Sequence, residues 1–529
     1  MSNQITSDTG STNPFLKKSD DQLQISPISD GQNNITDCEP HCLTVVNEEG
    51  FLQRILSHKQ VLSALLNELQ PVNFQELAEL TDGESLTKQH YLIISIQEMM
   101  KIATNNRWSL AMTDGFVFVF NGAYWKQLTA QEVKRFLGFG AEKLSVKKYT
   151  ARHFVFRDDL YKQFLSSAFL PKPERIGQEV LINLLNGTFV IKPKEQFLKS
   201  FDRRDFLTYQ LPFEYSPGAK APLFEKYLNR VLPDVILQKV MAEYISYVFI
   251  RHKTLKLEKA LILYGGGSNG KSVAFSIITA LLGPENVSNF SLQSLTNASG
   301  YQRAKISDKL LNYASEISPN MDSTLFKQLI SGEPIEARLP YKEPFMLEDY
   351  CKFIFNTNQL PSDVEHNEAF FRRFIILPFD VTISEDERDP ELANKIIANE
   401  LPGVFNWVLE GLERLLVQRR FTKSETIDRM VTEYKQQSDS VKLFIDEECY
   451  TIDLNSDIAL KKIYNTYRDY CSESGYKSCS LKNFSERLRN NGFTTSRKNF
   501  GTVVHAAKPK LFLSSALPTP AAPLDISFE

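Results

Sequence analysis

The segment from Gly265 to Ser272 constrains this chain more than any other feature of its sequence. It reads GGGSNGKS, follows the apolar run 260–264, and precedes an apolar segment with helical spacing that ends at Gly283. Strand, glycine loop and helix in this order are typical of a phosphate-binding loop, because glycines let successive backbone N–H groups turn toward phosphate oxygens at a helix N-terminus. The residues expected to hold a nucleotide are Gly265, Gly266, Gly267, Ser268, Asn269, Gly270, Lys271 and Ser272.

The polar side chains of this loop have separate expected roles. Lys271 is expected to bridge the β- and γ-phosphates of ATP, and the Ser272 hydroxyl to bind Mg²⁺. Asn269 is expected to face the γ-phosphate or a neighbouring subunit. A glycine-rich turn that arose by chance is the competing interpretation, and the predicted strand and helix on either side argue against it.

Polar residues also follow two further apolar runs. Glu316 comes after the run 309–314, where a carboxylate at the end of a strand can serve the metal ion, and Ser315 replaces the second acid that many phosphate-loop enzymes carry. Asn358 follows the run 350–355 and is expected to be a polar sensor of the γ-phosphate. A solvated loop glutamate and a turn-forming asparagine are the alternatives.

Two arginines, Arg372 and Arg373, precede the apolar run 374–379. An arginine held at the base of a buried strand can reach a transferred phosphate in its own subunit or in a neighbour. An exposed arginine pair without any such role is the alternative.

The alternation of apolar runs with helical text predicts an α/β fold, with an α+β domain before it and a small basic domain after it. In the first domain, hairpins are expected over 115–128, with Asn121–Gly122 at the turn, and around Asn186–Gly187. The predicted parts are a disordered tail 1–45, an α+β domain 46–222, an ATPase domain 223–420, a basic domain 421–513 and a flexible tail 514–529. The formal net charge of -3 and the lack of a long apolar run predict a cytoplasmic protein without membrane contact.

The last domain carries most of the positive charge. Residues 456–510 contain 11 Lys and Arg against 4 Asp and Glu. Two predicted helices followed by an extended segment suggest a winged helix that binds DNA. The expected contacts are Lys482, Arg487 and Arg489 on the second helix and Arg497 and Lys498 in the wing. A solvated basic domain or a protein-docking module is the alternative.

Taken in order, GGGSNGKS, LLNYASE, FKQLISGEPIEARLPYKEPF, FIFNTNQLP and FFRRFIILPF resemble the motif series of superfamily 3 helicases. They are most similar to the helicase portion of the phage and plasmid primase family and of poxvirus-type primase-helicases. The resemblance runs over 224–416 and, through INLLNGTFVI and LTYQLPFEYSP, weakens back toward residue 90. It implies an AAA+-like ATPase core, with Lys271 and Ser272 as the Walker A pair, Glu316 as the Walker B acid, Asn358 as the sensor and Arg373 as the arginine finger.

The same resemblance implies a DNA-gripping hairpin between Glu316 and Asn358. Its expected loop is 336–342, in which Arg338 and Lys342 can pair with phosphates and Tyr341 can stack on a base or sugar. A charged surface hairpin without a partner is the alternative.

Fuller members of the resembled family carry a primase domain of several hundred residues, whereas about 90 residues precede the matching region here. We therefore expect an ATP-dependent replicative DNA helicase of a phage, plasmid or mobile element, acting as a homo-oligomeric ring, a hexamer, on single-stranded and forked DNA with a separate primase. The alternatives are an ATP-dependent origin-binding regulator without unwinding activity, and a helicase-primase whose N-terminal region primes.

Overall fold

The computed structural model describes residues 43–508, apart from 47–51, 82, 114, 171–178, 193–194, 316, 318–320, 341, 362–363 and 365. Glu316 and Tyr341 therefore lie outside the described residues. So do the two expected tails, except for the last three residues of the first, which begin strand β1 (Leu43–Val46). Strand β1 pairs with β2 (Leu52–Ile55) in antiparallel fashion.

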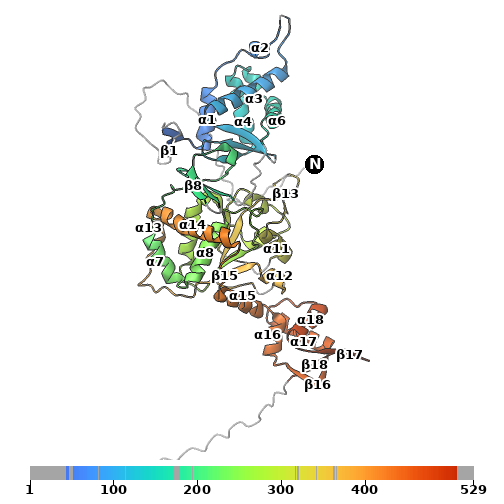
Figure 1. The fold of residues 1–529 in the computed structure, drawn as a ribbon. Coiled ribbons are helices and arrows are strands. Elements are labelled where there is room, and N and C mark those ends of the chain that lie inside the picture. Colours follow the sequence, from blue (N-terminus) through green and yellow to red (C-terminus); the bar gives the residue numbers. More distant parts are fainter. Residues whose placement is uncertain are drawn as a thin grey trace, which may run out of the picture. The chain divides into compact units, whose positions relative to one another are not determined.

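Residues 58–170 form helices around a three-stranded antiparallel sheet (Figure 1). The expected hairpin is confirmed, but Phe120 pairs with Trp125, so that four residues form its loop instead of two. The Asn121 Oδ1 atom accepts the backbone N–H groups of Ala123 and Tyr124, both at 3.0 Å, and thereby closes the longer loop. The elements are α1 (His58–Glu68), α2 (Phe74–Leu77), α3 (Lys88–Asn105), β3 (Ser109–Thr113), β4 (Phe116–Phe120), β5 (Trp125–Leu128), α4 (Ala130–Lys143), α5 (Lys148–Arg152) and α6 (Phe154–Ser167).

A second antiparallel sheet consists of β6 (Val180–Leu184), β7 (Gly187–Lys192) and β8 (Glu195–Lys199). Leu184 pairs with Gly187, so the turn is one residue earlier than the sequence suggested. The buried side chains of β6 and β7 belong to one hydrophobic cluster with those of helices in residues 222–418. The expected boundary at residue 222 therefore does not separate two hydrophobic cores.

A five-stranded sheet follows, in the order β10-β11-β14-β9-β15, and all its pairs are parallel. Its strands are β9 (Ala260–Tyr264), β10 (Val287–Ser288), β11 (Leu311–Ala314), β14 (Lys352–Thr357) and β15 (Phe374–Pro378). The short apolar runs form these strands because both faces of the sheet are covered. Leu261 and Leu263 pack into one hydrophobic cluster and Ala260 and Ile262 into another, as the alternation of a strand requires.

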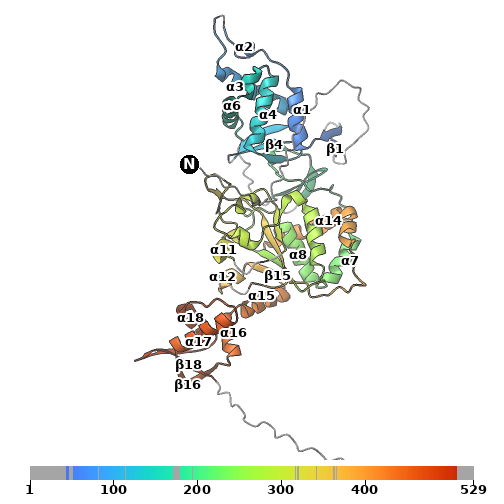
Figure 2. The same cartoon turned by 180° about the vertical axis from the view of Figure 1, so that it is seen from behind.

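Helices cover the two faces of this sheet (Figures 1 and 2). On one side lie α7 (Pro222–Val231), α8 (Val235–Tyr247), α9 (Lys271–Leu282), α13 (Leu392–Asn399) and α14 (Leu401–Gln418). On the other lie α10 (Leu292–Leu295), α11 (Ser323–Ser331), α12 (Glu368–Phe371) and the hairpin of β12 (Ile335–Ala337) and β13 (Phe345–Leu347).

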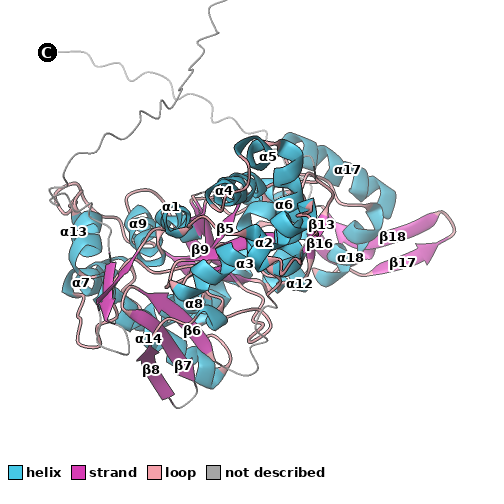
Figure 3. Cartoon of the chain, turned by 90° about the horizontal axis from the view of Figure 1, so that it is seen from above, coloured by secondary structure: helices cyan, strands magenta, loops and turns pink. Residues whose placement is uncertain are grey.

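Residues 421–440 are mostly polar and contain helix α15 (Glu425–Gln437). It forms because Ile427 and Tyr434 recur at helical spacing and are buried in the hydrophobic clusters on the two faces of the five-stranded sheet. The C-terminal domain then contains α16 (Ser440–Glu447), β16 (Thr451–Ala459), α17 (Leu460–Glu473), α18 (Leu481–Asn490), β17 (Thr495–Lys498) and β18 (Gly501–Ala507). Strands β17 and β18 form a hairpin next to β16, in the order β16-β18-β17 (Figure 3).

Candidate nucleotide-binding site

The carboxyl ends of three neighbouring strands meet at a cavity of about 890 Å³. Tyr264 at the end of β9 pairs with Thr357 of β14, and β11 pairs with the other side of β14. This register brings the predicted phosphate loop together with Ser315 and Asn358, which all line the cavity. Parallel sheets bind ligands at this edge, because loops and helix N-termini converge there.

The phosphate loop ends at helix α9, and its last glycine is required by the backbone. Gly270 has φ +86°, and a Cβ atom there would lie 2.7 Å from Cγ1 of Val231. Nothing lies within 4 Å of a Cβ atom at Gly266 or Gly267, so these residues border open space. The hydroxyl of Tyr227 donates a hydrogen bond of 2.8 Å to the Gly270 carbonyl and supports the turn from α7.

The Lys271 ammonium is held by oxygen atoms of its own loop. It donates to the carbonyls of Gly265 at 2.7 Å and Gly266 at 2.8 Å, and to Oδ1 of Asn269 at 3.0 Å. Burial lowers the pKa of this amine from its usual value. The oxygens of the loop therefore hold the ammonium close to residues 265–269.

Asn269 has hydrogen-bond partners within the fold and also lines the cavity. Its side-chain amide donates to the carbonyls of Gly266 at 2.8 Å and Phe379 at 2.9 Å, while its oxygen accepts from Lys271. The residue is 5% exposed. These bonds connect the loop to the end of β15.

Polar groups on the neighbouring strands complete this edge of the sheet. Asn358 directly follows β14 and is exposed, whereas Asn356 within the strand is buried and accepts a hydrogen bond of 3.0 Å from the Tyr313 hydroxyl. Of the two, Asn358 is therefore placed to reach a ligand. Ser272 is exposed beside Lys271, which makes its hydroxyl available to a metal ion. Among the described residues, no group of three or more His, Cys, Asp or Glu side chains could hold a metal.

One further residue of the site, Arg388, was not predicted from any sequence motif. It lies in the irregular segment between β15 and α13, and its Nη2 atom donates to Oγ of Ser268 at 3.0 Å. The Ile383 N–H group of the same segment donates to the Ser268 carbonyl at 2.7 Å. This segment therefore lines the cavity and brings an exposed guanidinium to the phosphate loop.

The two predicted arginines lie at the opposite edge of the sheet. The Ala260 N–H group donates to the Arg373 carbonyl at 2.8 Å, next to the first residue of β9, whereas the phosphate loop follows the last. A five-residue strand separates them by roughly 16 Å. The Arg373 side chain is 8% exposed and donates to Oγ of Ser331 at 2.7 Å, and the Arg372 side chain is 53% exposed and pairs with Glu258 at 2.7 Å.

Several of the side chains that were predicted to contact DNA are exposed. Arg338 is exposed at the start of the β12–β13 loop and donates to the Lys342 carbonyl at 3.2 Å. Lys482, Arg489 and Arg497 are exposed, and Lys498 pairs with Asp457. Arg487 differs from expectation: its side chain is 17% exposed and lies 3.5 Å from Asp439, because it points toward α16.

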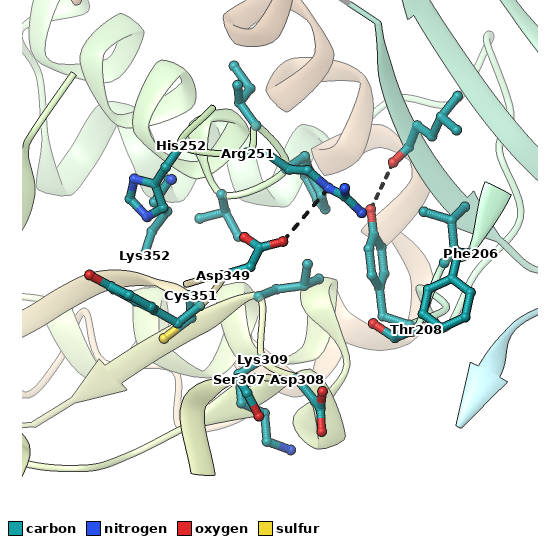
Figure 4. Close-up of a pocket in the computed structure, with 18 residues that line it drawn as sticks. Phe206, Thr208, Arg251, His252, Ser307, Asp308, Lys309, Asp349, Cys351 and Lys352 are labelled. Carbon is teal, nitrogen blue, oxygen red and sulfur yellow. Dashed lines mark hydrogen bonds and ion pairs between the residues drawn. The ribbon is translucent and has the colours of Figure 1, made fainter. Parts of the chain in front are cut away.

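A second cavity, of about 110 Å³, lies at the edge of the sheet opposite the phosphate loop (Figure 4). Cys351 and Lys352 at the start of β14 line it, together with His252, and Arg251 pairs with Asp349 at 4.0 Å at its margin. Burial raises the pKa of the Cys351 thiol to about 12, so this thiol stays protonated and inert at neutral pH.

The Lys352 ammonium is buried beside this cavity, 4.4 Å from the centre of the Tyr247 ring. Burial lowers its pKa from 10.5 to about 7. The folded protein therefore binds this proton less tightly than the unfolded chain does. The resulting loss in the free energy of unfolding is complete below pH 7 and disappears as the pH rises from 7 toward 10.5.

Lys352→Met is expected to raise the free energy of unfolding at pH 6 by about 1–4 kcal/mol, because it removes a charge that has little water around it. The gain should shrink as the pH rises to 9, and urea unfolding at both pH values measures it. Lys253→Met is the matched control, because that side chain is 87% exposed. Equal gains at pH 6 and pH 9 would show that burial does not lower the pKa of Lys352.

Comparisons with known protein families matched three parts of the chain. The chain matches the family "D5 N terminal like" over residues 98–233, the "Family of unknown function (DUF5906)" over 263–373 and the family "Poxvirus D5 protein-like" over 436–517. The two D5-type matches, one on either side of the phosphate loop, support a similarity to D5-like proteins.

Individual relatives were also found. A protein of Acanthamoeba polyphaga mimivirus named "Putative helicase L207/L206" is 24% identical over 282 residues, which cover 48% of this chain and 28% of that protein. The apo structure of the NrS-1 C-terminal region aligns with a TM-score of 0.41 and 12% identity over 77% of this chain and 98% of that one. Its A form aligns with the same TM-score and 13% identity. Within the part of the chain that the structure describes, no helix is long and apolar enough to span a lipid bilayer.

Proposed function

We propose that this chain is an ATP-hydrolysing DNA helicase of superfamily 3 with an AAA+-like core. The observation that carries the proposal is the division of the predicted catalytic residues between two edges of one sheet. The phosphate loop and Asn358 lie at one edge, and Arg373 lies at the other, next to Ala260. This division suits a site that two neighbouring subunits complete.

Within one subunit, the proposed roles follow from position. Lys271 exchanges its loop carbonyls for the β- and γ-phosphates of ATP, and Asn358 orients a water molecule or the γ-phosphate. Ser272, with Glu316 as the proposed carboxylate, would hold Mg²⁺, which neutralises charge on the phosphates. Arg388 reaches the same cavity and is a further cation for the phosphates.

The neighbouring subunit would supply the arginine. The backbone of Arg373 lies the length of a five-residue strand, roughly 16 Å, from the start of its own phosphate loop, and its side chain turns to Ser331. An arginine so placed is better suited to a phosphate bound by an adjacent copy. We propose Arg373 for this role, and the greater exposure of Arg372 makes that residue the second candidate. We propose assembly into a ring, a hexamer, which would place one such interface between each pair of neighbouring subunits.

The β12–β13 hairpin is the proposed moving contact with DNA. Ile335 pairs with Leu347 and Ala337 with Phe345, which leaves residues 338–344 between the two strands. Arg338 and Lys342 of this segment are exposed. Tyr341, in the same loop, would stack on a base or sugar.

Arg338→Ala together with Lys342→Ala is expected to leave ATP binding intact and to abolish the coupling of hydrolysis to DNA. Each lost contact with a single-strand phosphate lowers the slope of log affinity against log salt by about 0.7. Fluorescence anisotropy with labelled oligonucleotides over a salt series and forked-DNA unwinding measure both effects. Unchanged salt dependence and unwinding would contradict a channel role for the hairpin.

The C-terminal domain is proposed to be a winged helix. Its order of one helix, strand β16, two helices and the β17–β18 hairpin is that of a winged helix, in which α18 would enter the major groove. Lys482, Arg489 and Arg497 are the proposed contacts, since Arg487 is engaged with Asp439.

One experiment separates the candidate functions. A helicase displaces the strand of a forked duplex in the presence of ATP, whereas an origin-binding regulator binds DNA and hydrolyses ATP without strand displacement. The D5-type matches also favour a test for a helicase-primase, in which primer synthesis from ribonucleotides is the readout. Absence of ATP-dependent strand displacement in the full chain would overturn the proposed function.

A further inference from the structure

Two aromatic side chains protrude from the junction of helices α5 and α6. Tyr149 is 87% exposed, more than any other large apolar side chain that the structure describes, and Phe154 is 70% exposed. We call residues 147–155 the α5–α6 corner. The His153 ring lies 4.9 Å from that of Phe154 and widens this exposed aromatic surface. Burying aromatic rings stabilises a folded chain, so two rings left in water at one place suggest a partner.

The corner is also strongly basic. Residues 143–157 contain five Lys and Arg and no Asp or Glu, in a chain whose net charge is -3. Lys147 and Lys148 are exposed, and no ion pair with either occurs among the described residues. The two acids that follow are neutralised from outside the segment, Asp158 by Lys134 at 2.7 Å and Asp159 by Lys88. Because Arg152 pairs with Glu142, which directly precedes the segment, the excess positive charge that faces solvent comes from Lys143, Lys147 and Lys148.

Contacts beneath the corner hold it in place. Arg157 of α6 donates to the Ala151 carbonyl of α5 at 3.2 Å, and its guanidinium lies 5.6 Å from the centre of the Phe139 ring on α4. Gly138 makes room for this arginine, because a Cβ atom there would lie 2.5 Å from Arg157 Nε. The Arg152 side chain forms two hydrogen bonds with Glu142, at 2.9 and 3.0 Å. The corner is a fixed platform on three helices.

We propose that the α5–α6 corner binds single-stranded nucleic acid, with Tyr149 and Phe154 stacking on bases and Lys147 and Lys148 on the phosphates. Aromatic platforms bordered by basic residues suit unpaired strands, because every base then has a free face. A duplex offers such faces only at its ends. An acidic protein or an anionic membrane would satisfy the charge but would leave the flat stacking surfaces unused.

The inference deepens the proposed function and rests on it, because it gives the strand a second contact besides the β12–β13 hairpin. It also assigns a task to the domain formed by residues 58–170. The contact needs no nucleotide, so strand binding at the corner is expected with or without ATP.

The first test uses the full chain and fluorescein-labelled dT20. Tyr149→Ala with Phe154→Ala should weaken binding by about tenfold or more at every salt concentration, because stacking carries no counterion release. Lys147→Ala with Lys148→Ala should instead lower the slope of log affinity against log salt by about 1.4. Phe169→Ala, which removes a ring that is 64% exposed elsewhere in this domain, is the matched control and should bind like the wild type.

A second test detects base stacking directly by fluorescence and does not require a large change in affinity. In Phe154→Trp, unlabelled dT20 should quench the added emission, measured as the difference from the wild type with its three native tryptophans. Circular dichroism and melting temperatures confirm that each variant folds. Forked-DNA unwinding by the wild type is measured alongside, because its absence would overturn the helicase proposal and leave strand binding at the corner to be judged by itself.

Three results would overturn the inference. The first is wild-type affinity of the double aromatic variant combined with unquenched emission of Phe154→Trp. The second is a change of oligomeric state in the aromatic variant, which would identify an interface between copies of the chain. The third is that the double aromatic variant loses binding to vesicles that contain phosphatidylserine but still binds dT20, which would identify a membrane contact.

Discussion

Lys271→Ala is expected to reduce ATP hydrolysis at least about 10²- to 10³-fold, because it removes a cation that stabilises charge developing in the transition state. In the structure this ammonium has three oxygen partners within its own loop, at 2.7, 2.8 and 3.0 Å, and all three belong to residues 265–269. The substitution therefore removes the charge without breaking a contact to another part of the fold.

Phosphate release measured with and without single-stranded DNA gives the result. Lys253→Ala is a suitable control, because that lysine is 87% exposed and pairs only with the surface residue Glu348, at 3.6 Å, among the described residues. Turnover near that of the wild type in Lys271→Ala would remove the basis for the proposed active site.

The second large effect concerns Arg373. An arginine finger contributes about 10³- to 10⁵-fold to hydrolysis, so Arg373→Ala alone should be inactive, as should Lys271→Ala alone. A mixture of the two should recover part of the activity, because an interface that combines an intact lysine with an intact arginine forms only between different mutant subunits.

Arg372→Ala provides the comparison within the same pair. If Arg373 is the arginine finger, a mixture of Arg372→Ala and Lys271→Ala subunits should hydrolyse ATP little faster than Arg372→Ala alone. The opposite pattern would assign the role to the more exposed arginine, whose side chain pairs with Glu258. Inactivity of both mixtures, with mixed assemblies shown by size measurements, would exclude a shared site.

The sequence predicted features that depend on the local order of strands, loops and helices. The order of strand, loop and helix at 260–282 predicted the phosphate loop, and apolar runs predicted β11, β14 and β15, because buried parallel strands need apolar residues on both faces. Asn358 also lies directly after strand β14, as its position after an apolar run predicted. The two-residue strand β10 was missed, since two residues show no periodicity.

Side-chain partners were not predictable in the same way. Asn269 turns its amide to the Phe379 carbonyl, 110 residues away in the chain, and Arg487 turns to Asp439. Arg388 contacts Ser268 across 120 residues. No local pattern encodes such contacts, because they depend on how distant segments pack. Helix α15 is hard to recognise from the sequence for a related reason, since only two residues of the helix, Ile427 and Tyr434, are buried.

The placement of the phosphate loop and the arginine pair at opposite ends of β9 and β15 has a consequence for symmetry. If one subunit completes the site of the next, the two surfaces in contact are different, so the interface is heterologous. A two-fold dimer pairs one surface with itself, so it could join an arginine to a phosphate loop only if both edges of the sheet lay within that single interface. A closed ring has as many complete sites as subunits, whereas an open chain of the same subunits has one fewer. Ring closure would therefore add one whole active site at a single step, and hydrolysis per subunit should rise at that step.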